Sequence, residues 1–320
     1  GLKLELDLKK GALETDIKSL KKAARQSVGP ELEKRIQTII ETGLIELSED
    51  SKIYWNKSPI GKLVSGRDYL NPNIELIVDD ILEIDQRQKL INFLDKWLKN
   101  KIDTILKSLI DLKNLQEKNS SVKALAYRLY ENNGVLIRDQ VSEYLKNLGQ
   151  NERKILRDLG VKFGRYHIFL HRLIKPEAVT LRTLLWKNQN QKYYNLKPPT
   201  YGLNFLDHNK TRNKNFMLLC GFEKFNNFYI RIDILERLFM KIINSDTEKN
   251  KEIKVVPEML NLLGCNKENF KKVLKDMNYK IIEKENEVFF KYSPKKNIKK
   301  ISKEIKKESP FGVLKDLNFN

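Results

Sequence analysis

The sequence predicts a mainly α-helical protein with small β-hairpins, of the α+β class, in which a helical bundle domain precedes a winged-helix-like domain. Residues 73–133 contain neither Gly nor Pro, and their apolar residues recur every three or four positions, which is the spacing of a helix that buries one face. Elsewhere, short runs of alternating apolar residues lie beside turn residues, which is typical of small antiparallel sheets.

Length and composition exclude several classes of protein. The chain has 320 residues, enough for two or three domains of roughly 100–150 residues each. Its hydrophobic fraction of 40% is too high for a wholly disordered chain. No apolar stretch reaches the roughly 20 residues of a spanning helix, and no N-terminal apolar segment reads as a signal peptide. Cys220 and Cys265 cannot form a disulfide framework. We therefore expect a cytoplasmic protein with no membrane partner.

Residues 1–78 are predicted to form an N-terminal subdomain of helices and a β-hairpin. Residues 12–42 have the character of two helices separated at Gly29-Pro30, because Pro suits a first helical turn. Gly43 is a typical helix end. Residues 43–64 then alternate between apolar and polar side chains, with turn residues at 48–51 and 57–59. This pattern predicts a small antiparallel sheet or wing.

Residues 79–190 are predicted to form a helical domain that carries a basic and aromatic β segment. The first helix ends near 114–121, where Ser120 or Ser121 can cap the next helix, which stops at 132–134. Further helices are expected over 138–147 and 151–158, a β segment over 161–170, and a helix from Pro176 to about residue 188. The stripe of the first helix consists of Ile91, Leu94, Leu98, Ile102, Ile105, Leu109 and Leu112.

Residues 191–215 are predicted to be a linker, because they are rich in Asn, Gln and Lys and contain the adjacent prolines Pro198 and Pro199. Residues 216–293 are predicted to be winged-helix-like. A strand at 216–222 or 228–232 precedes a helix that starts at Asp233.

A short helix between Pro257 and Gly264, a helix capped by Asn266 and two β runs at 279–283 and 287–292 complete the winged-helix order. The third helix places its core face, Phe270, Val273, Leu274 and Met277, opposite three lysines spaced by four, Lys267, Lys271 and Lys275. In a winged helix these lysines would meet phosphates; the alternative is an ordinary amphipathic helix in a Lys-rich protein. Residues 294–320 form a basic tail.

The charge of the chain is informative mainly through its distribution. The chain has 61 basic and 42 acidic side chains, a net charge of +19 and a pI of about 9.6. Most basic residues are Lys, which an AT-rich coding sequence favours. However, the first hundred residues are neutral, and the excess lies in residues 121–200 and 267–307. Half of the arginines lie between Arg128 and Arg182, and Arg binds phosphates well. This distribution favours nucleic acid as the partner.

The strongest candidate site lies within residues 160–186, where basic groups alternate with rings that can stack on bases. This mixture is what the binding of single-stranded RNA or DNA requires. The alternative is a compact β turn whose aromatic residues belong to the core. The candidate residues in this segment are Arg165, Tyr166, His167, Arg172, Lys175 and Arg182, accompanied by Phe163 and Phe169.

No complete catalytic or metal site is predicted from the sequence. The pattern GxxxxGK[ST] of a phosphate-binding loop is missing. His167 and His171 are four residues apart, but no acidic residue lies near them in sequence, which favours a structural or stacking role over a metal site. We therefore expect no catalytic residue, metal or cofactor in this chain.

Seven stretches spread over most of the chain carry a family resemblance: WNKSPIGKLVSG (55–66), LNPNIELIVDD (70–80), GVLIR (134–138), GVKFGRYHIFLHRLIKP (160–176), LLW (184–186), RIDILERL (231–238) and SPFGVL (309–314). In this order they resemble the C-terminal region of large alphaproteobacterial superfamily-two (DEAD/DEAH-like) helicases related to the mitochondrial RNA-degradosome helicase. In that family two RecA-like domains hold ATP and Mg²⁺, and a helical region completes the channel for the strand.

The resemblance implies that the chain is the nucleic-acid-binding accessory portion of an ATP-dependent, RNA-directed helicase. It would grip single strands of RNA or DNA while motor domains in cis, which are not part of this sequence, hydrolyse ATP. No catalytic residue of the family maps onto the chain. The alternative is a winged-helix DNA-binding or regulatory protein without enzymatic activity, and a third possibility is a protein-interaction scaffold.

Overall fold

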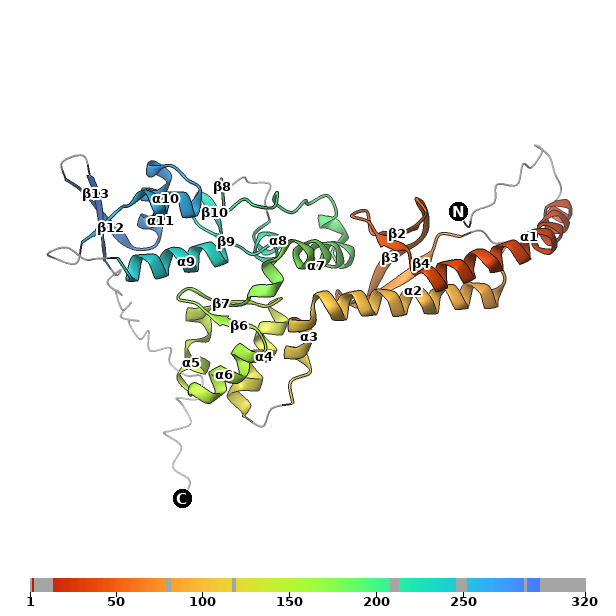
Figure 1. The fold of residues 1–320 in the computed structure, drawn as a ribbon, viewed down its shortest axis with the longest axis horizontal. Helices are drawn as coiled ribbons and strands as arrows, with labels where there is room; N and C mark the ends of the chain where they lie inside the picture. The colour runs from red at the N-terminus through yellow and green to blue at the C-terminus, as the bar shows by residue number, and fades with distance from the viewer. Residues whose placement is uncertain are drawn as a thin grey trace, which may run out of the picture.

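The computed structural model describes residues 2, 14–78, 82–116, 119–207, 213–245, 252–284 and 287–293. In this part of the chain the fold is mixed α+β, with helices and four small antiparallel sheets, as expected from the sequence (Figure 1). The N-terminal helices α1 and α2 lie at one end, the C-terminal elements α9–β13 lie at the other, and helix α7 lies between them.

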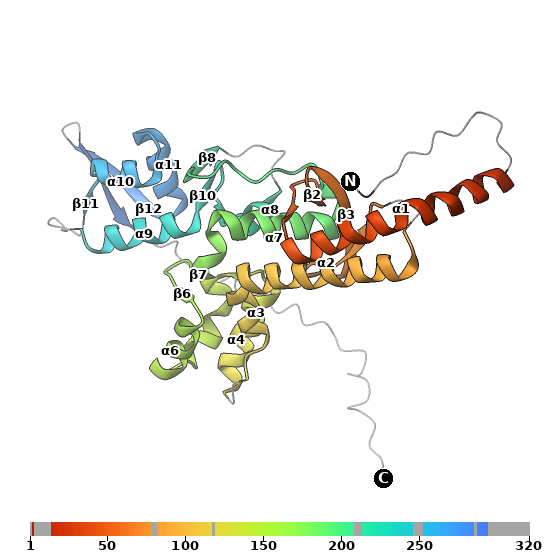
Figure 2. The same ribbon diagram turned by 45° about the vertical axis from the view of Figure 1, so that its right-hand side comes forward.

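Helix α1 (Glu14–Thr42) is continuous through Pro30, so the prediction of two helices over residues 12–42 is wrong. Pro30 has no N–H for the helical ladder, which normally favours a break. Here Pro30 is exposed, whereas Leu32, Ile36 and Ile39 after it are buried. Tertiary packing against α2 (Ile84–Ile105) therefore outweighs the local cost, and an ion pair of 2.8 Å between Lys89 and Glu33 joins the two helices. They lie side by side in Figures 1 and 2.

The antiparallel sheet expected over residues 43–64 is present and contains a further strand. Its order is β1 (Ile45–Leu47), β2 (Lys52–Trp55), β3 (Ser58–Asp68) and β4 (Asn71–Leu76). The sequence did not predict β4. This strand lies at the sheet edge, where Pro72 does not interrupt the ladder.

The long apolar stripe forms α2 and α3 (Lys107–Lys113), with a break at the buried Leu106. The predicted gap before α4 (Ser120–Glu131) is confirmed, but its cap is Asn119, whose side chain accepts the N–H groups of Ser121 and Val122. The most buried residues of the α2 stripe are Leu90, Leu94, Leu98 and Ile102, so the stripe starts one residue earlier than predicted.

The predicted β segment over 161–170 is a hairpin in a three-stranded sheet of order β5-β7-β6. The predicted helix at Pro176 is confirmed as α7. Most of its length is buried, which makes it the central support of the fold. The elements of this region are β5 (Val135–Ile137), η1 (Arg138–Val141), α5 (Ser142–Lys146), α6 (Gln150–Asp158), β6 (Val161–Phe163), β7 (His167–Leu170), η2 (His171–Ile174), α7 (Pro176–Gln189) and η3 (Gln191–Tyr193).

The segment predicted as a linker contributes β8 (Phe205–Asp207), which pairs with β10 (Phe228–Arg231). The sheet order is β8-β10-β9, with β9 at Phe222–Lys224. The strand predicted at 216–222 is instead mostly helix α8 (Lys214–Leu219), whose N-terminus is capped by Asn213. The alternative strand at 228–232 is confirmed by β10.

The C-terminal elements follow the predicted order of helices and hairpin. Gly264 ends α10 with a φ of 72°, the left-handed conformation that glycine adopts without strain. The Asn266 side chain accepts the Asn269 N–H at the start of α11, as expected. The predicted core face of α11 is buried. The elements are α9 (Ile232–Ile243), β11 (Ile253–Lys254), α10 (Pro257–Leu263), α11 (Lys267–Asp276), β12 (Tyr279–Lys284) and β13 (Glu287–Tyr292).

Strands β11, β13 and β12 form the last three-stranded sheet, with β13 in the centre. The predicted basic tail over 294–320 lies outside the described residues. Among the helices that are described, none combines the length and the apolar composition needed to cross a membrane.

Candidate nucleic-acid interface

A groove of about 860 Å³ lies between the β6–β7 hairpin and helix α9. Its walls combine positive charge with aromatic rings, and two acidic side chains lie among them. The basic and imidazole residues are Arg138, Lys162, Arg165, His171 and Arg237, the rings are Phe163, Phe169 and Phe239, and the acids are Asp233 and Glu236.

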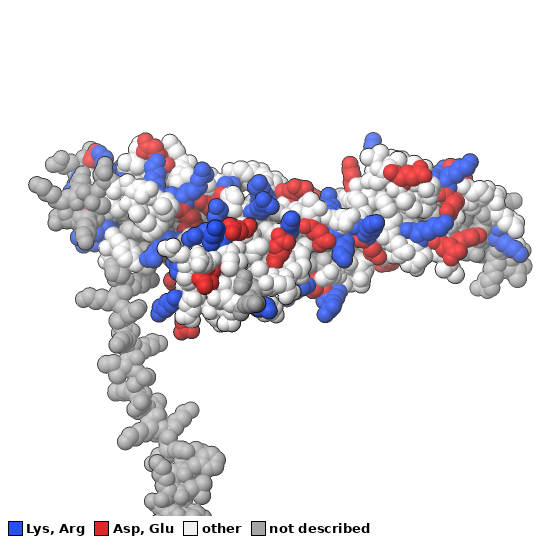
Figure 3. Space-filling model, turned by 60° about the horizontal axis from the view of Figure 1, so that its bottom comes forward, with Lys and Arg blue, Asp and Glu red and all other residues white. Residues whose placement is uncertain are grey.

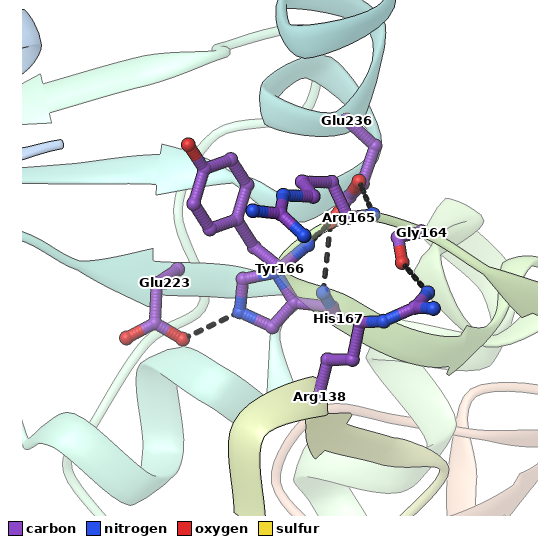
Figure 4. Close-up of polar contacts among 7 residues, drawn as sticks. All are labelled: Arg138, Gly164, Arg165, Tyr166, His167, Glu223 and Glu236. Atoms are coloured by element: carbon purple, nitrogen blue, oxygen red, sulfur yellow. Dashed lines mark hydrogen bonds and ion pairs between the residues drawn. The ribbon is translucent and has the colours of Figure 1, made fainter. Parts of the chain in front are cut away.

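The Glu236 carboxylate of α9 holds the turn that connects β6 and β7. It accepts the backbone N–H groups of Arg165, Tyr166 and His167, the last two at 2.9 and 2.8 Å (Figure 4). Burial alone would raise the pKa of Glu236, but these donors and the His167 ring lower it below its ordinary value. The turn is therefore pinned to α9 by an ionised carboxylate.

Gly164 allows this close approach. A Cβ atom at residue 164 would overlap the Glu236 carboxylate, which cannot move without losing its three N–H donors. The Gly164 carbonyl also accepts a hydrogen bond from the Arg138 guanidinium, so the turn is fixed from its other side as well.

His167 is a buried joint between the hairpin and two other elements. Its side chain is 2% exposed, its Nε2 lies 2.8 Å from Glu223 of β9, and its Nδ1 lies 3.4 Å from Glu236 (Figure 4). Burial by itself lowers the pKa of His167, but the two carboxylates outweigh burial and raise the pKa above its ordinary value. The imidazole is therefore inaccessible to a base, and its burial favours the structural role over the stacking role, the two roles expected for it.

Tyr166 and Arg165, the two residues before His167, differ in their exposure to solvent. The Tyr166 ring packs edge-on against Phe239 at a centroid distance of 5.4 Å, and burial raises its pKa. Arg165 is exposed, and its guanidinium lies 5.6 Å from the centroid of the same Phe239 ring. Arg165 is thus the predicted residue that the groove presents most openly to a ligand.

Arg182 is fully buried, which excludes the predicted contact with a nucleic acid in this fold. Its guanidinium donates to the carbonyls of Asn133, Leu173 and Leu219 at 2.7, 2.6 and 2.8 Å. Burial lowers its pKa to about 10. Arg182 therefore ties α7 to three neighbouring segments.

Arg172 and Lys175 are exposed but do not line the groove, whereas their neighbour His171 does. The sequence pattern is correct about their exposure but gives no information about which side of the hairpin they occupy.

The α11 lysines lie apart from the groove. Lys271 forms ion pairs with Glu268 at 3.0 Å and with Glu283 of β12 at 2.8 Å, and these carboxylates raise its pKa. Lys267 and Lys275 are exposed, and their charges help to lower the pKa of Glu283. The charge of the central lysine is therefore already compensated within the fold.

A second hollow of about 770 Å³ shares Arg165 and Phe239 with the groove and extends it across α9 towards β12 and β13. Its walls include the apolar residues Ile242 and Ile243 and the ring of Tyr292. The two hollows therefore adjoin each other at Arg165 and Phe239.

Sequence reasoning missed Arg138, Lys162, Arg237 and Phe239. The first two lie in or beside short strands, and Phe239 directly follows Leu238, a residue of the buried face of α9. Helical spacing places Arg237 outside the buried face of α9, so its exposure could have been predicted from the sequence. Its position beside the hairpin depends on tertiary structure and could not.

Basic and acidic side chains are interspersed along the face drawn in Figure 3 rather than gathered into one uniform patch. In the described ranges, no group of three metal-ligating side chains that could hold an ion is present. No protein-family model, curated protein or solved structure matches the chain.

Proposed function

We propose that this chain binds single-stranded nucleic acid through the groove between the β6–β7 hairpin and α9. The observation that carries the proposal is the combination of unpaired basic groups and aromatic rings in one groove. Among the described contacts, Arg165 and Arg237 have no ion-pair partner, and both line the groove beside Phe239. Bases stacked on aromatic rings contribute roughly 1–3 kcal/mol each, and the basic groups neutralise the backbone.

The hairpin turn is built in a way that suits binding. Glu236, Arg138 and His167 fix its backbone, so the Arg165 side chain starts from a rigid position. A ligand then does not have to order the turn when it binds, which lowers the entropic cost. A single strand fits this arrangement better than a duplex does, because its bases are free to contact rings on the groove wall.

Within this proposal the chain is the accessory portion of an ATP-dependent, RNA-directed helicase. The support is the sequence resemblance described above, and the motor domains in cis would hold ATP and Mg²⁺. The residues described here would grip the strand and supply no step of ATP hydrolysis.

The alternative is a winged-helix protein that reads duplex DNA. The order α9, α10, α11, β12, β13 and the pairing of β11 with β13 support a winged-helix-like arrangement of this part. In that case Lys267 and Lys275 of α11 would contact phosphates. The ion pairs of Lys271 argue against this reading, because its charge is already used inside the fold.

Binding of fluorescein-labelled oligouridylate and of a duplex of equal length, measured by anisotropy over a range of salt concentrations, tests the proposal. We expect the single strand to bind more tightly, with an affinity that falls as salt rises. Arg165→Glu should weaken binding at least about tenfold, whereas Lys154→Glu, an exposed lysine on α6 outside the groove, should not. Absence of binding, or binding without salt dependence, would exclude the proposal; duplex preference with sensitivity to Lys267→Glu would select the alternative.

A further inference from the structure

A second cleft, of about 260 Å³, lies on α7 away from the groove. It is bounded by α7, by the turn between β1 and β2, and by the loop that follows η3. The residues that matter for its chemistry are Lys187, Thr183, Tyr194, Lys197, Glu49 and Asp50.

Lys187 is the unusual residue of this cleft. It is 8% exposed, yet within the described part of the chain its ammonium makes neither a hydrogen bond nor an ion pair. Its nearest described partner is the ring of Tyr194, with 5.8 Å between Nζ and the ring centroid. Burial lowers the pKa of Lys187 more than the nearby Glu49 carboxylate raises it, and the charge of Lys197 at the mouth lowers it further. The side chain is thus largely covered, while its ammonium opens into the cleft without a hydrogen-bonding anion, and a bound anion would improve its environment.

The walls of the cleft are fixed by contacts that do not involve Lys187. The Tyr194 hydroxyl donates to the Asp50 carbonyl at 3.1 Å, which ties the loop to the N-terminal sheet. The Ser65 hydroxyl donates to the Asn188 carbonyl at 3.1 Å, which ties β3 to α7. The cleft is therefore preformed, which favours binding of a small ligand.

The hydrogen-bonding groups in the cleft select the type of ligand. The Thr183 hydroxyl already donates to the Val179 carbonyl, so the available donors are the ammonium groups of Lys187 and Lys197. Asp50 is engaged by Lys52 at 3.1 Å and by the Tyr54 hydroxyl at 3.0 Å, which compensates its charge. Glu49 is exposed at the rim. Lys187 is therefore the charged group of the interior, and the oppositely charged Glu49 and Lys197 lie at the exposed mouth.

We propose that this cleft binds a phosphate group between Lys187 and Lys197. Its volume suits a phosphate with part of a sugar better than a whole nucleotide. The phosphate can come from a free phosphomonoester or from the backbone of a bound strand, and the chemistry at the two lysines is the same. The site does not depend on the groove at α9, so it stands whether or not the proposed function does.

Thermal unfolding of the full chain tests the site, with inorganic phosphate added at constant ionic strength against chloride. We expect phosphate to raise the Tm of the wild type. Lys187→Met should abolish the response to phosphate, because it removes the ammonium group that would bind the anion. Lys192→Met, an exposed lysine five residues away, should leave the response unchanged.

A second variant, Lys197→Met, tests the site independently if Lys187→Met does not fold. Lys197 is exposed, so Lys197→Met should fold normally and weaken the phosphate response severalfold. If phosphate stabilises Lys187→Met and Lys197→Met as much as the wild type, its effect is general exclusion from the surface and the proposal is overturned. Absence of any phosphate effect on the wild type overturns it as well.

Titrations of ribose 5-phosphate and of an oligonucleotide without terminal phosphate then identify the source. Both are carried out in the Arg165→Glu background, which removes the groove contact. A response to ribose 5-phosphate that Lys187→Met abolishes assigns a free phosphomonoester. A response to the oligonucleotide alone, lost in the same variant, assigns the strand backbone. No Lys187-dependent response to either ligand contradicts the proposal.

Discussion

The β6–β7 turn and helix α11 were both predicted as phosphate contacts because of their basic residues, but the structure treats their charges differently. In the turn, the Glu236 carboxylate accepts hydrogen bonds from backbone N–H groups and forms no ion pair with the Arg165 guanidinium, which lies over the Phe239 ring. In α11, Glu268 and Glu283 take up the charge of Lys271 directly. The comparison teaches that the uncompensated part of a positive charge, rather than the number of lysines and arginines, identifies a binding surface.

Among the variants that test this comparison, the largest loss of stability is expected from a substitution of Arg182. This arginine belongs to the segment predicted to bind nucleic acid, but its role in the fold is structural. Arg182→Met leaves three carbonyls without their donor, two of them in buried contacts, and each buried unsatisfied carbonyl costs about 1–3 kcal/mol. We expect a loss of at least about 3 kcal/mol in the free energy of unfolding, measured by urea denaturation. Stability within about 1 kcal/mol of that of the wild type would contradict a structural role for Arg182.

Gly164→Ala should cause the next largest loss of stability, because it disrupts the contacts that hold the β6–β7 turn. The new methyl group displaces the Glu236 carboxylate from its N–H donors, at a cost of about 1–3 kcal/mol. Affinity for a single strand should fall with it, because Arg165 is then no longer held in place. Gly29→Ala, at a position in α1 with no neighbouring atoms within 4 Å and, like Gly164, without a positive φ, controls for the added methyl group alone. Equal losses of binding in both variants would show that the Glu236 contact is not the cause.

The buried contact between His167 and the carboxylates of Glu223 and Glu236 makes the stability of the fold depend on pH. The folded pKa of His167 is above its ordinary value, so the protonated ring stabilises the fold. This contribution is fully present below the ordinary pKa of about 6.5 and is lost as pH rises through the raised folded value. Glu236 behaves in the opposite sense, because its lowered pKa makes its contribution disappear as pH falls through the folded value.

We therefore expect the urea midpoint of the wild type to fall as pH rises from about 6 to about 9, and the midpoint of His167→Gln to fall less. If the urea midpoints of the two proteins change in parallel with pH, His167 is not the cause of the pH dependence.

The smallest effect is expected from Lys271→Ala, because its partners Glu268 and Glu283 are largely exposed to solvent and screened. Its Tm should stay close to that of the wild type. Affinity for a single strand should also stay the same, because the charge removed was already compensated. A clear loss of affinity with an unchanged Tm would give α11 a direct role in binding.

Much of the local structure followed from the sequence, because it depends on local physics. The cap at Asn266, the helix end at Gly264 and the buried face of α11 were all predictable from spacing and residue type. Pro30 and β8 were not. A helix continues through Pro30 because residues after it pack on α2, and β8 exists because β10 offers it a partner.

The candidate site was predictable only in part for the same reason. The sequence identified the basic and aromatic hairpin but could not separate Arg165 on the surface from Arg182 in the interior. Both are arginines within one segment, and their difference arises from which way α7 and the hairpin face. Arg237 and Phe239 lie about seventy residues away in sequence, and helix α9 brings them to the hairpin.

Binding of a single strand by two double variants tests the central claim most directly. Arg165→Glu combined with Arg237→Glu reverses two groove charges, and Lys267→Glu combined with Lys275→Glu reverses the two exposed charges of α11, so both variants change the net charge equally. We predict that the groove variant lowers affinity at least about tenfold and flattens its salt dependence, while the α11 variant stays close to wild type. Equal losses in both variants, or a larger loss in the α11 variant, would contradict the claim that the groove along α9 is the binding surface.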